Sequence, residues 1–439
     1  MSDYMFRLES HLTGEQFRVV GQVQAIASKA GVSLYLTGGA MRDVFAGFPA
    51  RDLDFTTEST PAKLAKPLEK HGGVLVSTDD RKKSIHLKFP GGVTVEIGMA
   101  HTEKFGKPGA APQITPSTIH EDLQCRDFTV NAVALSLNKA SLGLIIDPAN
   151  GMGDIERKEL RTISNYAFYD DPARILRLIR LKIRMGYQID ERTRMQLDNA
   201  REAGMLDRIT PEALGEELRA MAAEVNSHDL VKALEDEKLL QLFSPVLAGG
   251  KVNYATLQRL QKAHQMVPFG IEFKVHPLPL FLETVLEKLN AKEQAALMKA
   301  TGITRPEISA MEKLGPAAKK MERTLMGGKL QKASLLYQVL MKTPGEQILH
   351  LAVFSNQRIV QDRIKNFFTK HLPAALEITN EMVTATGAVL GTPKFQRVKE
   401  EMILTRLDAR PKKEPPPEPP PPPPMSGFAR GAGLRRAQG

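Results

Sequence analysis

The spacing of apolar residues changes near residue 150. Before that point, helical and strand-like patterns alternate. The helical segments are 15–30, 40–48 and 61–70, and the strand-like segments are 34–37, 52–55, 84–89 and 93–99. The last two strands flank Pro90-Gly91-Gly92 and predict an antiparallel hairpin. Helical periods then dominate to about residue 408. The sequence therefore predicts an α+β protein: a small α/β head with a mixed or antiparallel sheet, followed by an extended all-α neck, body and tail.

Two segments lack such a pattern. Residues 98–118 contain Gly, Pro and Lys with little periodicity, which predicts a mobile loop. Residues 411–424 hold ten of the 29 prolines and predict extended polyproline-type chain, followed by a small, basic, disordered end. This end is either a solvated tail or a supplementary contact to RNA. The predicted division is a head over 1–146, a neck over 147–225, a body and tail over 226–410 and a disordered tail over 411–439.

The charge balance favours a polyanionic partner. The chain has 60 Lys and Arg against 50 Asp and Glu, a net charge of +10, which suits RNA or DNA. The single cysteine, Cys125, excludes an internal disulfide framework and a cysteine-based zinc site. No apolar run approaches the ~18 residues that span a membrane, and the N-terminus fits neither a signal nor a transit peptide. A cytoplasmic location is expected.

The segment that contains Asp52 and Asp54 indicates a cation site. Side chains two residues apart in a strand point to the same face, so these carboxylates are neighbours. Two like charges so close are unfavourable unless a cation lies between them, and hard oxygen ligands suit Mg²⁺. Such an ion, held by carboxylates and substrate phosphates, serves phosphoryl and nucleotidyl transfer. An ordinary exposed pair has the same spacing, so the pattern alone leaves both interpretations open.

The residues before this pair favour the functional interpretation. Gly38 and Gly39 follow a strand and lead into a helix, which offers backbone N–H groups and a helix N-terminus to an anion. Arg42 and Asp43 are expected in the first turn of that helix, where a surface ion pair is the alternative. A phosphate-binding turn followed by a metal-binding pair is what a nucleoside-triphosphate-using transferase needs. No G-x-x-x-x-G-K-[ST] segment is present, which argues against a P-loop ATPase.

A family resemblance rests on five segments. "GGAMRDVFAGFPARDLDF" (38–55) closely resembles the G-G-x-V-R-D-x-x-x-G-x-x-x-x-D-x-D signature of the class II tRNA nucleotidyltransferase and bacterial poly(A) polymerase family. The other segments, in the family's order, are "CRDFTVNAVAL" (125–135), "DPANGMGDI" (147–155), "DDPARILRLIRLKIRMGY" (170–187) and "TPEALGEEL" (210–218). The resemblance covers about 34–220. The departures from the usual Val, Arg, Glu and Arg are Met41, Cys125, Asp170 and Ala213.

The resemblance implies roles for individual residues. It makes Asp52 and Asp54 the catalytic pair that binds metal, and Glu96 a candidate third carboxylate. The implied nucleotide site consists of Gly38, Gly39, Arg42, Asp43, Arg126, Asp127 and Asn131, together with the base-reading residues Asp171 and Arg174. Three further arginines are expected to be solvated or to face phosphate: Arg177, Arg180 and Arg184.

Asp171 and Arg174 lie three residues apart at a predicted helix start, where an ordinary ion pair is the simplest interpretation. The resemblance assigns them to the incoming base, and the chemistry agrees. Cytosine and adenine each present an amine donor beside a ring-nitrogen acceptor, which match a carboxylate and a guanidinium. Uracil and guanine reverse both bonds, at roughly 1–3 kcal/mol for each unpaired group. The pair would therefore select C and A together.

The resemblance implies a template-independent RNA nucleotidyltransferase, with CCA addition to tRNA from CTP and ATP as the first expectation. A bacterial poly(A) polymerase and an enzyme that adds only CC or only A are alternatives within the family. A non-catalytic RNA-binding protein on the same scaffold is the alternative from a different class. Mg²⁺ is the implied cofactor, and the tRNA acceptor arm is the implied partner of the basic body. The residues indicate no membrane contact and no obligate protein partner.

Overall fold

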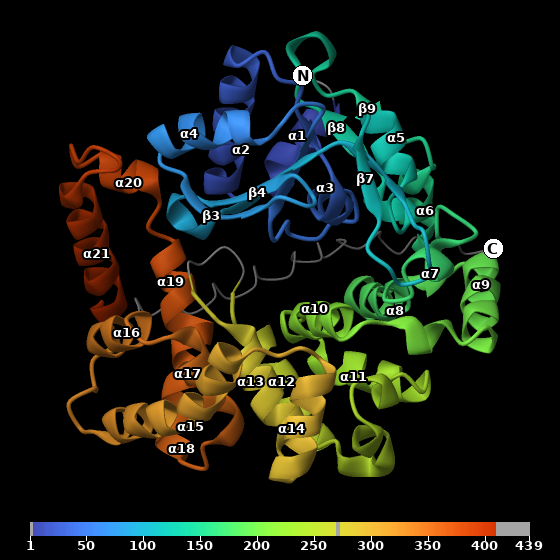
Figure 1. Ribbon diagram of the computed structural model, residues 1–439. Coiled ribbons are helices and arrows are strands. Elements are labelled where there is room, and N and C mark those ends of the chain that lie inside the picture. The colour runs from blue at the N-terminus through green and yellow to red at the C-terminus, as the bar shows by residue number, and fades with distance from the viewer. Residues whose placement is uncertain (1–2, 269–272, 410–439) are drawn as a thin grey trace, which may run out of the picture.

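A computed structural model describes residues 3–268 and 273–409 (Figure 1). Its N-terminal part is built on a seven-stranded sheet in the order β3-β4-β5-β2-β1-β8-β9. The strands are β1 (Tyr35–Leu36), β2 (Leu53–Thr57), β3 (Val74–Asp79), β4 (Ser84–Lys88), β5 (Thr94–Met99), β8 (Ala134–Ser136) and β9 (Ile145–Ile146). β2 and β5 run parallel and the other neighbours run antiparallel, so the predicted mixed sheet is confirmed.

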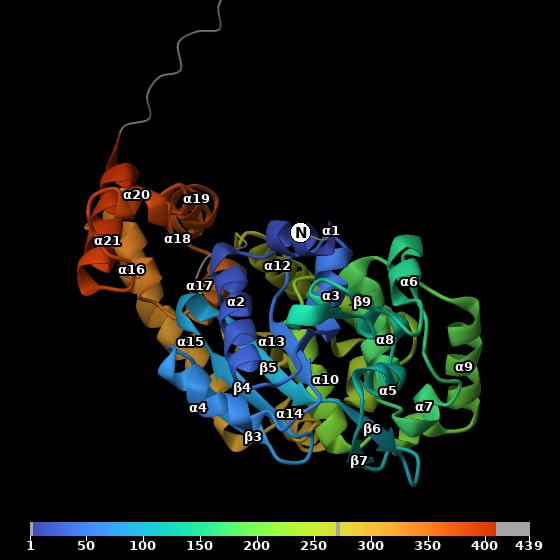
Figure 2. The same ribbon diagram turned by 90° about the horizontal axis from the view of Figure 1, so that it is seen from above.

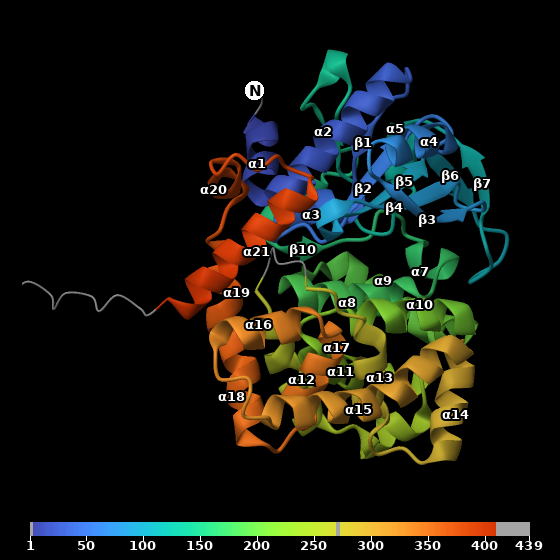
Figure 3. The same ribbon diagram turned by 90° about the vertical axis from the view of Figure 1, so that its left-hand side faces the viewer.

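Four helices of the head precede or follow its first strands, and three of them, α2 to α4, were predicted. They are α1 (Asp3–His11), α2 (Gly14–Lys29), α3 (Gly38–Phe45) and α4 (Ala62–Lys70), and α2 and α4 cover the side of the sheet away from α10 (Figures 1 and 3). A capping box between Thr13 and Gln16 starts α2. Leu53 and Phe55 are buried in the head core, as the alternation along β2 predicts. Helix α1 is an addition to the prediction.

The described chain after residue 147 is mainly helical and lies largely below the head (Figures 1 and 3), with its C-terminal helices to one side (Figure 2). Helix α5 (Ile119–Gln124) still belongs to the head. The neck region contains α6 (Gly151–Arg157), α7 (Ala167–Asp170), α8 (Arg174–Met185), α9 (Glu191–Glu202) and α10 (Pro211–Ala222). The body contains α11 (Ser227–Asp236), α12 (Tyr254–Gln265), α13 (Pro277–Leu286), α14 (Ala291–Ala300), α15 (Arg305–Met326), α16 (Ala333–Met341), α17 (Gly345–Phe354), α18 (Arg358–Asn366), α19 (Leu372–Leu376), α20 (Asn380–Thr384) and α21 (Pro393–Asp408).

Three local predictions need correction. The segment 98–118, predicted as a mobile loop, contains an antiparallel hairpin of β6 (His101–Lys104) and β7 (Gln113–Pro116) with an irregular tip between the two strands. Its strands are short and polar, so they carry no apolar alternation. Strand β3 was not predicted, because it lies at the sheet edge with Val74 and Val76 exposed. Two short parallel strands also occur after residue 150, β10 (Glu159–Leu160) and β11 (Gln188–Ile189).

Two further expectations concern the chain as a whole. No helix in the described ranges is long and apolar enough to cross a membrane. The predicted disordered tail over 411–439 lies outside the described residues.

Candidate functional site

A cavity of about 680 Å³ lies between the head sheet, the β6–β7 hairpin, and helices α8 and α10. It is large enough for a nucleotide. Nine of the predicted site residues line it: Gly38, Gly39, Arg42, Asp54, Arg126, Asp127, Asn131, Asp171 and Arg174. These residues come from segments up to 136 positions apart, Gly38 and Arg174 being the ends of that span. The fold therefore brings the predicted nucleotide-binding and base-reading residues around one cavity.

The glycine pair allows the backbone to approach a carboxylate. The backbone N–H of Gly39 donates to Asp54 Oδ2 at 2.9 Å. A Cβ on Gly38 or Gly39 would lie 3.2 or 3.1 Å from the same oxygen, and Gly38 has a φ of +62°. A side chain at either position would crowd the carboxylate. Helix α3 begins at Gly38 itself, so Arg42 lies one turn further along than predicted, still facing the cavity.

Asp54 is half-buried among other carboxylates. Burial raises its pKa to about 6, and the charges of Glu96 and Asp52 add to this effect, while Arg42 opposes it. Glu96 lies directly across from Asp54 in the parallel β2–β5 pair and also lines the cavity, where the sequence placed a candidate third carboxylate. Asp52 is exposed outside the cavity wall and accepts a hydrogen bond from the Thr94 hydroxyl.

This carboxylate cluster suits a hard cation in part. Burial and the charges of Glu96 and Asp52 make the ionised form of Asp54 unfavourable, and a bound divalent ion would stabilise that form. Carboxylate oxygens are also the ligands that Mg²⁺ prefers. Within the described residues, however, no group of three or more His, Cys, Asp or Glu side chains is arranged to hold a metal by itself. A cation at Asp52 and Asp54 would therefore need further ligands from water or a bound phosphate, which is the usual arrangement for Mg²⁺.

The raised pKa of Asp54 predicts a pH-dependent response to magnesium. In the metal-free protein, the folded state binds this proton more tightly than the unfolded state, so the contribution of Asp54 to stability falls as pH rises from about 4 to about 6. Above that window the ionised carboxylate is free to bind a cation. We expect Mg²⁺ to raise the thermal midpoint more at about pH 7.5 than at about pH 5. Asp54→Asn should remove most of this difference; an unchanged difference in that variant would exclude Asp54 as its source.

A hydrogen-bonded chain connects the arginine of α3 to the second motif. Arg42 donates to Asn131 Oδ1 at 2.8 Å, and the Asn131 amide donates to Asp127 Oδ1 at 2.8 Å. Burial would raise the pKa of Asp127, but the charges of Arg177 and Arg174 outweigh it and lower the pKa. Asp127 is therefore ionised, and its carboxylate holds the guanidinium of Arg177 beside the cavity.

Arg126 is held on the cavity wall by a carboxylate and a hydroxyl. Its guanidinium donates to Asp122 Oδ2 at 2.6 and 3.0 Å and to the Thr56 hydroxyl at 3.3 Å. Cys125, which stands where the family usually has arginine, also lines the cavity. The cavity therefore has Arg126 and Arg42 available to an anionic ligand near Asp54.

Asp171 and Arg174 face the opposite side of the cavity. Asp171 precedes α8 and Arg174 is its first residue, so the predicted helix start is confirmed within three residues. Arg174 Nε lies 3.7 Å from Asp171 Oδ2, too far for a hydrogen bond, and it is buried with no hydrogen-bond partner in the described structure. Because a buried donor without a partner costs free energy, this atom indicates a ligand that accepts a hydrogen bond here.

The β6–β7 hairpin adds residues that the sequence did not single out. Glu103 Oε2 lies 3.6 Å from the Arg174 guanidinium, whose centre is 5.8 Å from the Phe105 ring centroid. Glu212 and Glu216 of α10 also line the cavity, beside Ala213. The sequence offered one signal for Glu103 and Phe105. They are a charged and an aromatic residue two positions apart, and they lie between the motif segments 38–55 and 125–135.

The prediction for the arginines of α8 needs correction, although Arg177 does line the cavity. Arg177, Arg180 and Arg184 were expected to be solvated or to face phosphate, yet each pairs with buried carboxylates. Arg177 lies 2.9 Å from both Asp127 and Glu217, and Arg180 lies 3.2 Å from Glu217. The sequence could not reveal these partners, because Glu217 lies 37 to 40 positions away.

Asp43 also differs from its predicted role. It does not line the cavity and is buried between Arg42 and Arg184, with Arg42 Nη2 at 2.8 Å. Burial and the charge of Arg42 lower the pKa of Arg184 to about 10, and Asp43 opposes this effect. Asp43 therefore joins α3 of the head to α8 of the neck.

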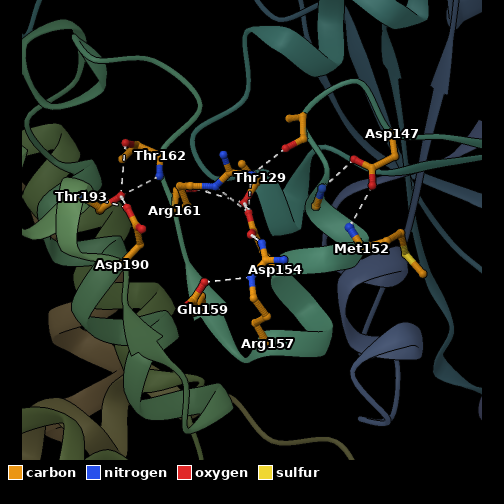
Figure 4. A network of polar contacts seen from close by, with 12 residues as sticks. Thr129, Asp147, Met152, Asp154, Arg157, Glu159, Arg161, Thr162, Asp190 and Thr193 are labelled. Carbon is orange, nitrogen blue, oxygen red and sulfur yellow. Dashed lines mark hydrogen bonds and ion pairs between the residues drawn. The ribbon is translucent and has the colours of Figure 1, made fainter.

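The segment "DPANGMGDI" forms the covalent joint between head and neck (Figure 4). The Asp147 carboxylate accepts hydrogen bonds from the backbone N–H groups of Gly151 and Met152 at 2.7 and 2.9 Å. Asp154 is fully buried and accepts from the Thr129 hydroxyl at 2.6 Å and from Arg161 Nε at 2.9 Å. A Cβ at residue 151 would lie 2.0 Å from the Thr129 carbonyl oxygen, so only glycine fits there. Hydrogen bonds of Asp147 and Asp154 and the close contact at Gly151 therefore fix the backbone of this joint.

Comparison with known proteins agrees with this geometry. Residues 34–161 match the family model described as the poly A polymerase head domain. An A-adding tRNA nucleotidyltransferase of Aquifex aeolicus (strain VF5) is 31% identical over 240 residues, 54% of this chain and 29% of that protein. Over residues 34–161, this chain therefore resembles the poly A polymerase head domain. The matched segment contains β1, α3, β2 and the second motif, which together line one side of the cavity.

Solved structures share the fold over nearly the whole chain. "The structure of CCA-adding enzyme apo form II" has a TM-score of 0.55 and 24% identity, covering 94% of this chain and 96% of that one. A Thermotoga maritima CCA-adding enzyme complexed with tRNA has a TM-score of 0.51 and 24% identity, covering 94% and 96%. At this identity the structures show the shared fold. The chain spans only 29% to 56% of the length of the first curated relatives that it matches.

Proposed function

We propose that this protein is a template-independent nucleotidyltransferase that adds nucleotides to the 3′ end of tRNA. The observation that carries the proposal is the single cavity that joins Asp54 and the glycine turn on one wall to Asp171 and Arg174 on the other. The first wall suits a triphosphate and the second suits a base, so one nucleotide fits across both. The A-adding and CCA-adding activities named for its relatives support the same reaction.

The reaction would be attack of the RNA 3′-hydroxyl on the α-phosphate, with release of pyrophosphate. Gly38, Gly39, Arg42 and Arg126 would hold the triphosphate, because all four line the cavity close to Asp54. Holding the reacting groups in this order lowers the entropic cost of the attack. Mg²⁺, bound by Asp52 and Asp54, would stabilise the charge that develops on the reacting oxygens.

The base would be read by Asp171 and Arg174. The buried Arg174 Nε needs an acceptor, which a cytosine or adenine ring nitrogen supplies. The Asp171 carboxylate is an acceptor for the exocyclic amine. Burial raises the pKa of Asp171, an effect that Arg177 and Arg174 oppose. CTP and ATP are therefore the proposed substrates, with the tRNA acceptor arm held by the helical body.

The division into a head over 1–146, a neck over 147–225 and a body and tail over 226–410 remains our proposal for how these tasks are distributed. The cytoplasmic location stays a prediction that follows from tRNA as substrate. Full CCA addition is the proposed reaction. Addition of A alone is the second candidate, because the Aquifex aeolicus and Halalkalibacterium halodurans relatives are named A-adding enzymes.

Product lengths distinguish these candidates. The purified protein is given tRNAs that end before CCA, after the first C and after CC, with CTP and ATP supplied separately and together. Full CCA addition predicts that all three substrates reach the same final length when both nucleotides are present. An A-adding enzyme extends only the substrate that ends in CC, and a poly(A) polymerase extends RNA by many adenylates. A protein that extends none of them under any condition would contradict the proposal.

The hairpin tip should control the last addition. Phe105 and Glu103 contact Arg174, so the hairpin is placed to influence base reading. We expect a Gly-Ser replacement of residues 104–112 to retain addition of C and to stall before the terminal A. Product lengths on a tRNA lacking CCA measure this. If the replacement adds the terminal A as well as the wild type does, the hairpin is merely a connector.

A further inference from the structure

Glu224 lies just beyond the end of α10, where the neck meets the head. Its side chain is only 4% exposed. The carboxylate pairs with three arginines: Arg51 at 2.9 Å, Arg180 at 3.2 Å and Arg184 at 4.0 Å. Arg51 belongs to the head, whereas Arg180 and Arg184 lie on α8. One buried carboxylate therefore holds cations from both sides of the joint.

The partners of Glu224 lie next to the two halves of the proposed site. Arg51 directly precedes Asp52 at the entry to β2, and α8 begins with Arg174. A change in the position of Glu224 would therefore alter how the carboxylate strand faces the base-reading helix. Glu217 differs in this respect, because both of its arginine partners, Arg177 and Arg180, lie on α8.

The charges at this joint make Glu224 necessary for close approach. Arg42 and Arg51 of the head face Arg180 and Arg184 of α8, and the carboxylate of Asp43 also lies between them. Burial and the neighbouring Arg42 and Arg51 lower the pKa of Arg184. Without the charge of Glu224, the arginines would repel one another across a partly desolvated interface. The head and α8 would then separate or rotate.

We propose that Glu224 is a positioning residue that fixes the triphosphate-binding wall of the head relative to the base-reading wall of the neck. This inference rests on the proposed function, since the two walls form one site only for a whole nucleotide. It also makes a specific prediction. Loss of Glu224 should lower the affinity for ligands that contact both walls and should leave the affinity for ligands that contact the head alone unchanged.

Calorimetric titration with two ligands tests this prediction. ATP reaches both walls, whereas inorganic tripolyphosphate has no base and binds the head alone. We expect Glu224→Gln to weaken ATP binding by about tenfold or more, because small displacements of positioned groups have large effects. Tripolyphosphate affinity should stay within about twofold of wild type, in the same magnesium buffer. Arg51→Met, which removes the head partner from a partly exposed position, should shift the ratio in the same direction and covers the case in which Glu224→Gln fails to fold.

Glu237 provides a matched control. Its carboxylate also bridges two arginines, Arg194 at 2.9 Å and Arg201 at 2.7 Å, but both lie on α9 and neither belongs to the head. Glu237→Gln should reduce the thermal midpoint and leave the ratio of ATP to tripolyphosphate affinity unchanged.

Equal losses for both ligands in Glu224→Gln, or no loss for either, would overturn the positioning role. The same holds if Glu237→Gln changes the ratio as much as Glu224→Gln does. Failure of the proposed function is a separate result, because it would appear as an absence of nucleotide addition by the wild-type protein. The ratio of the two affinities does not require turnover, so the two failures are distinguishable.

Discussion

Asp54→Asn should reduce nucleotide addition by about 10³-fold or more, with little change in tRNA affinity. Asp54 lies beside the glycine turn, Glu96 and Asp52, and burial together with the charges of these carboxylates raises its pKa to about 6. Asparagine preserves the size of the side chain and its bond to the Gly39 N–H as an acceptor. It removes the negative charge that a divalent cation requires. Asp52→Asn should have a similar effect, although Asp52 is exposed and contributes from the edge of the cavity.

The measurement compares magnesium-dependent incorporation with a gel-shift assay for tRNA. Glu69→Gln is a suitable control, because Glu69 is an exposed carboxylate of α4 outside the cavity. It should behave as wild type in both assays. Near-normal turnover by Asp54→Asn would contradict the catalytic role of this residue and would leave Asp52 and Asp54 as an ordinary pair of strand carboxylates.

Arg174→Ala should relax base selection as well as slow the reaction. Its Nε is a buried donor without a partner, and the guanidinium packs between Asp171, Glu103 and Phe105. Without the guanidinium, a uracil or guanine ring N–H no longer meets a donor of the protein. A mismatched donor pair costs roughly 1–3 kcal/mol, so the preference for CTP over UTP should fall by about tenfold. The rate with CTP should also fall, because the base is held less firmly against the attacking hydroxyl.

Competition among the four nucleoside triphosphates on one tRNA substrate measures this preference. Arg192→Ala is the control, since Arg192 is an exposed arginine of the neighbouring helix α9 and does not line the cavity. An unchanged ratio in Arg174→Ala, with only a uniform loss of rate, would return Asp171 and Arg174 to the role of a helix-start ion pair.

Local patterns predicted the parts of the site that lie within one element. The alternation around Asp54 identified β2, and the glycine pair identified the start of α3, because both depend on neighbours in sequence. Glu96 was a candidate through the family resemblance, and the structure pairs it with Asp54 across β2 and β5. Asp171 and Arg174 were found at a helix start and do face the same cavity.

The parts that were missed depend on partners far apart in the sequence. The arginines of α8 looked like solvated charges, because nothing local shows that Asp127, Asp43 and Glu217 would meet them. The hairpin β6–β7 has strands of four residues each, too short and polar for a period-two signal. Glu103 and Phe105 became site residues only through the folding of this hairpin over Arg174.

The decisive measurement follows the α-phosphate. Wild-type protein is incubated with magnesium, a tRNA that ends before CCA and CTP labelled at either the α- or the γ-phosphate. We expect label in the RNA from α-labelled CTP only, one pyrophosphate released for each nucleotide added, and loss of both signals in Asp54→Asn. Folded wild-type protein that binds the tRNA yet transfers no α-label, with CTP or with ATP on a tRNA ending in CC, would contradict a nucleotidyltransferase and favour a non-catalytic RNA-binding protein on this scaffold.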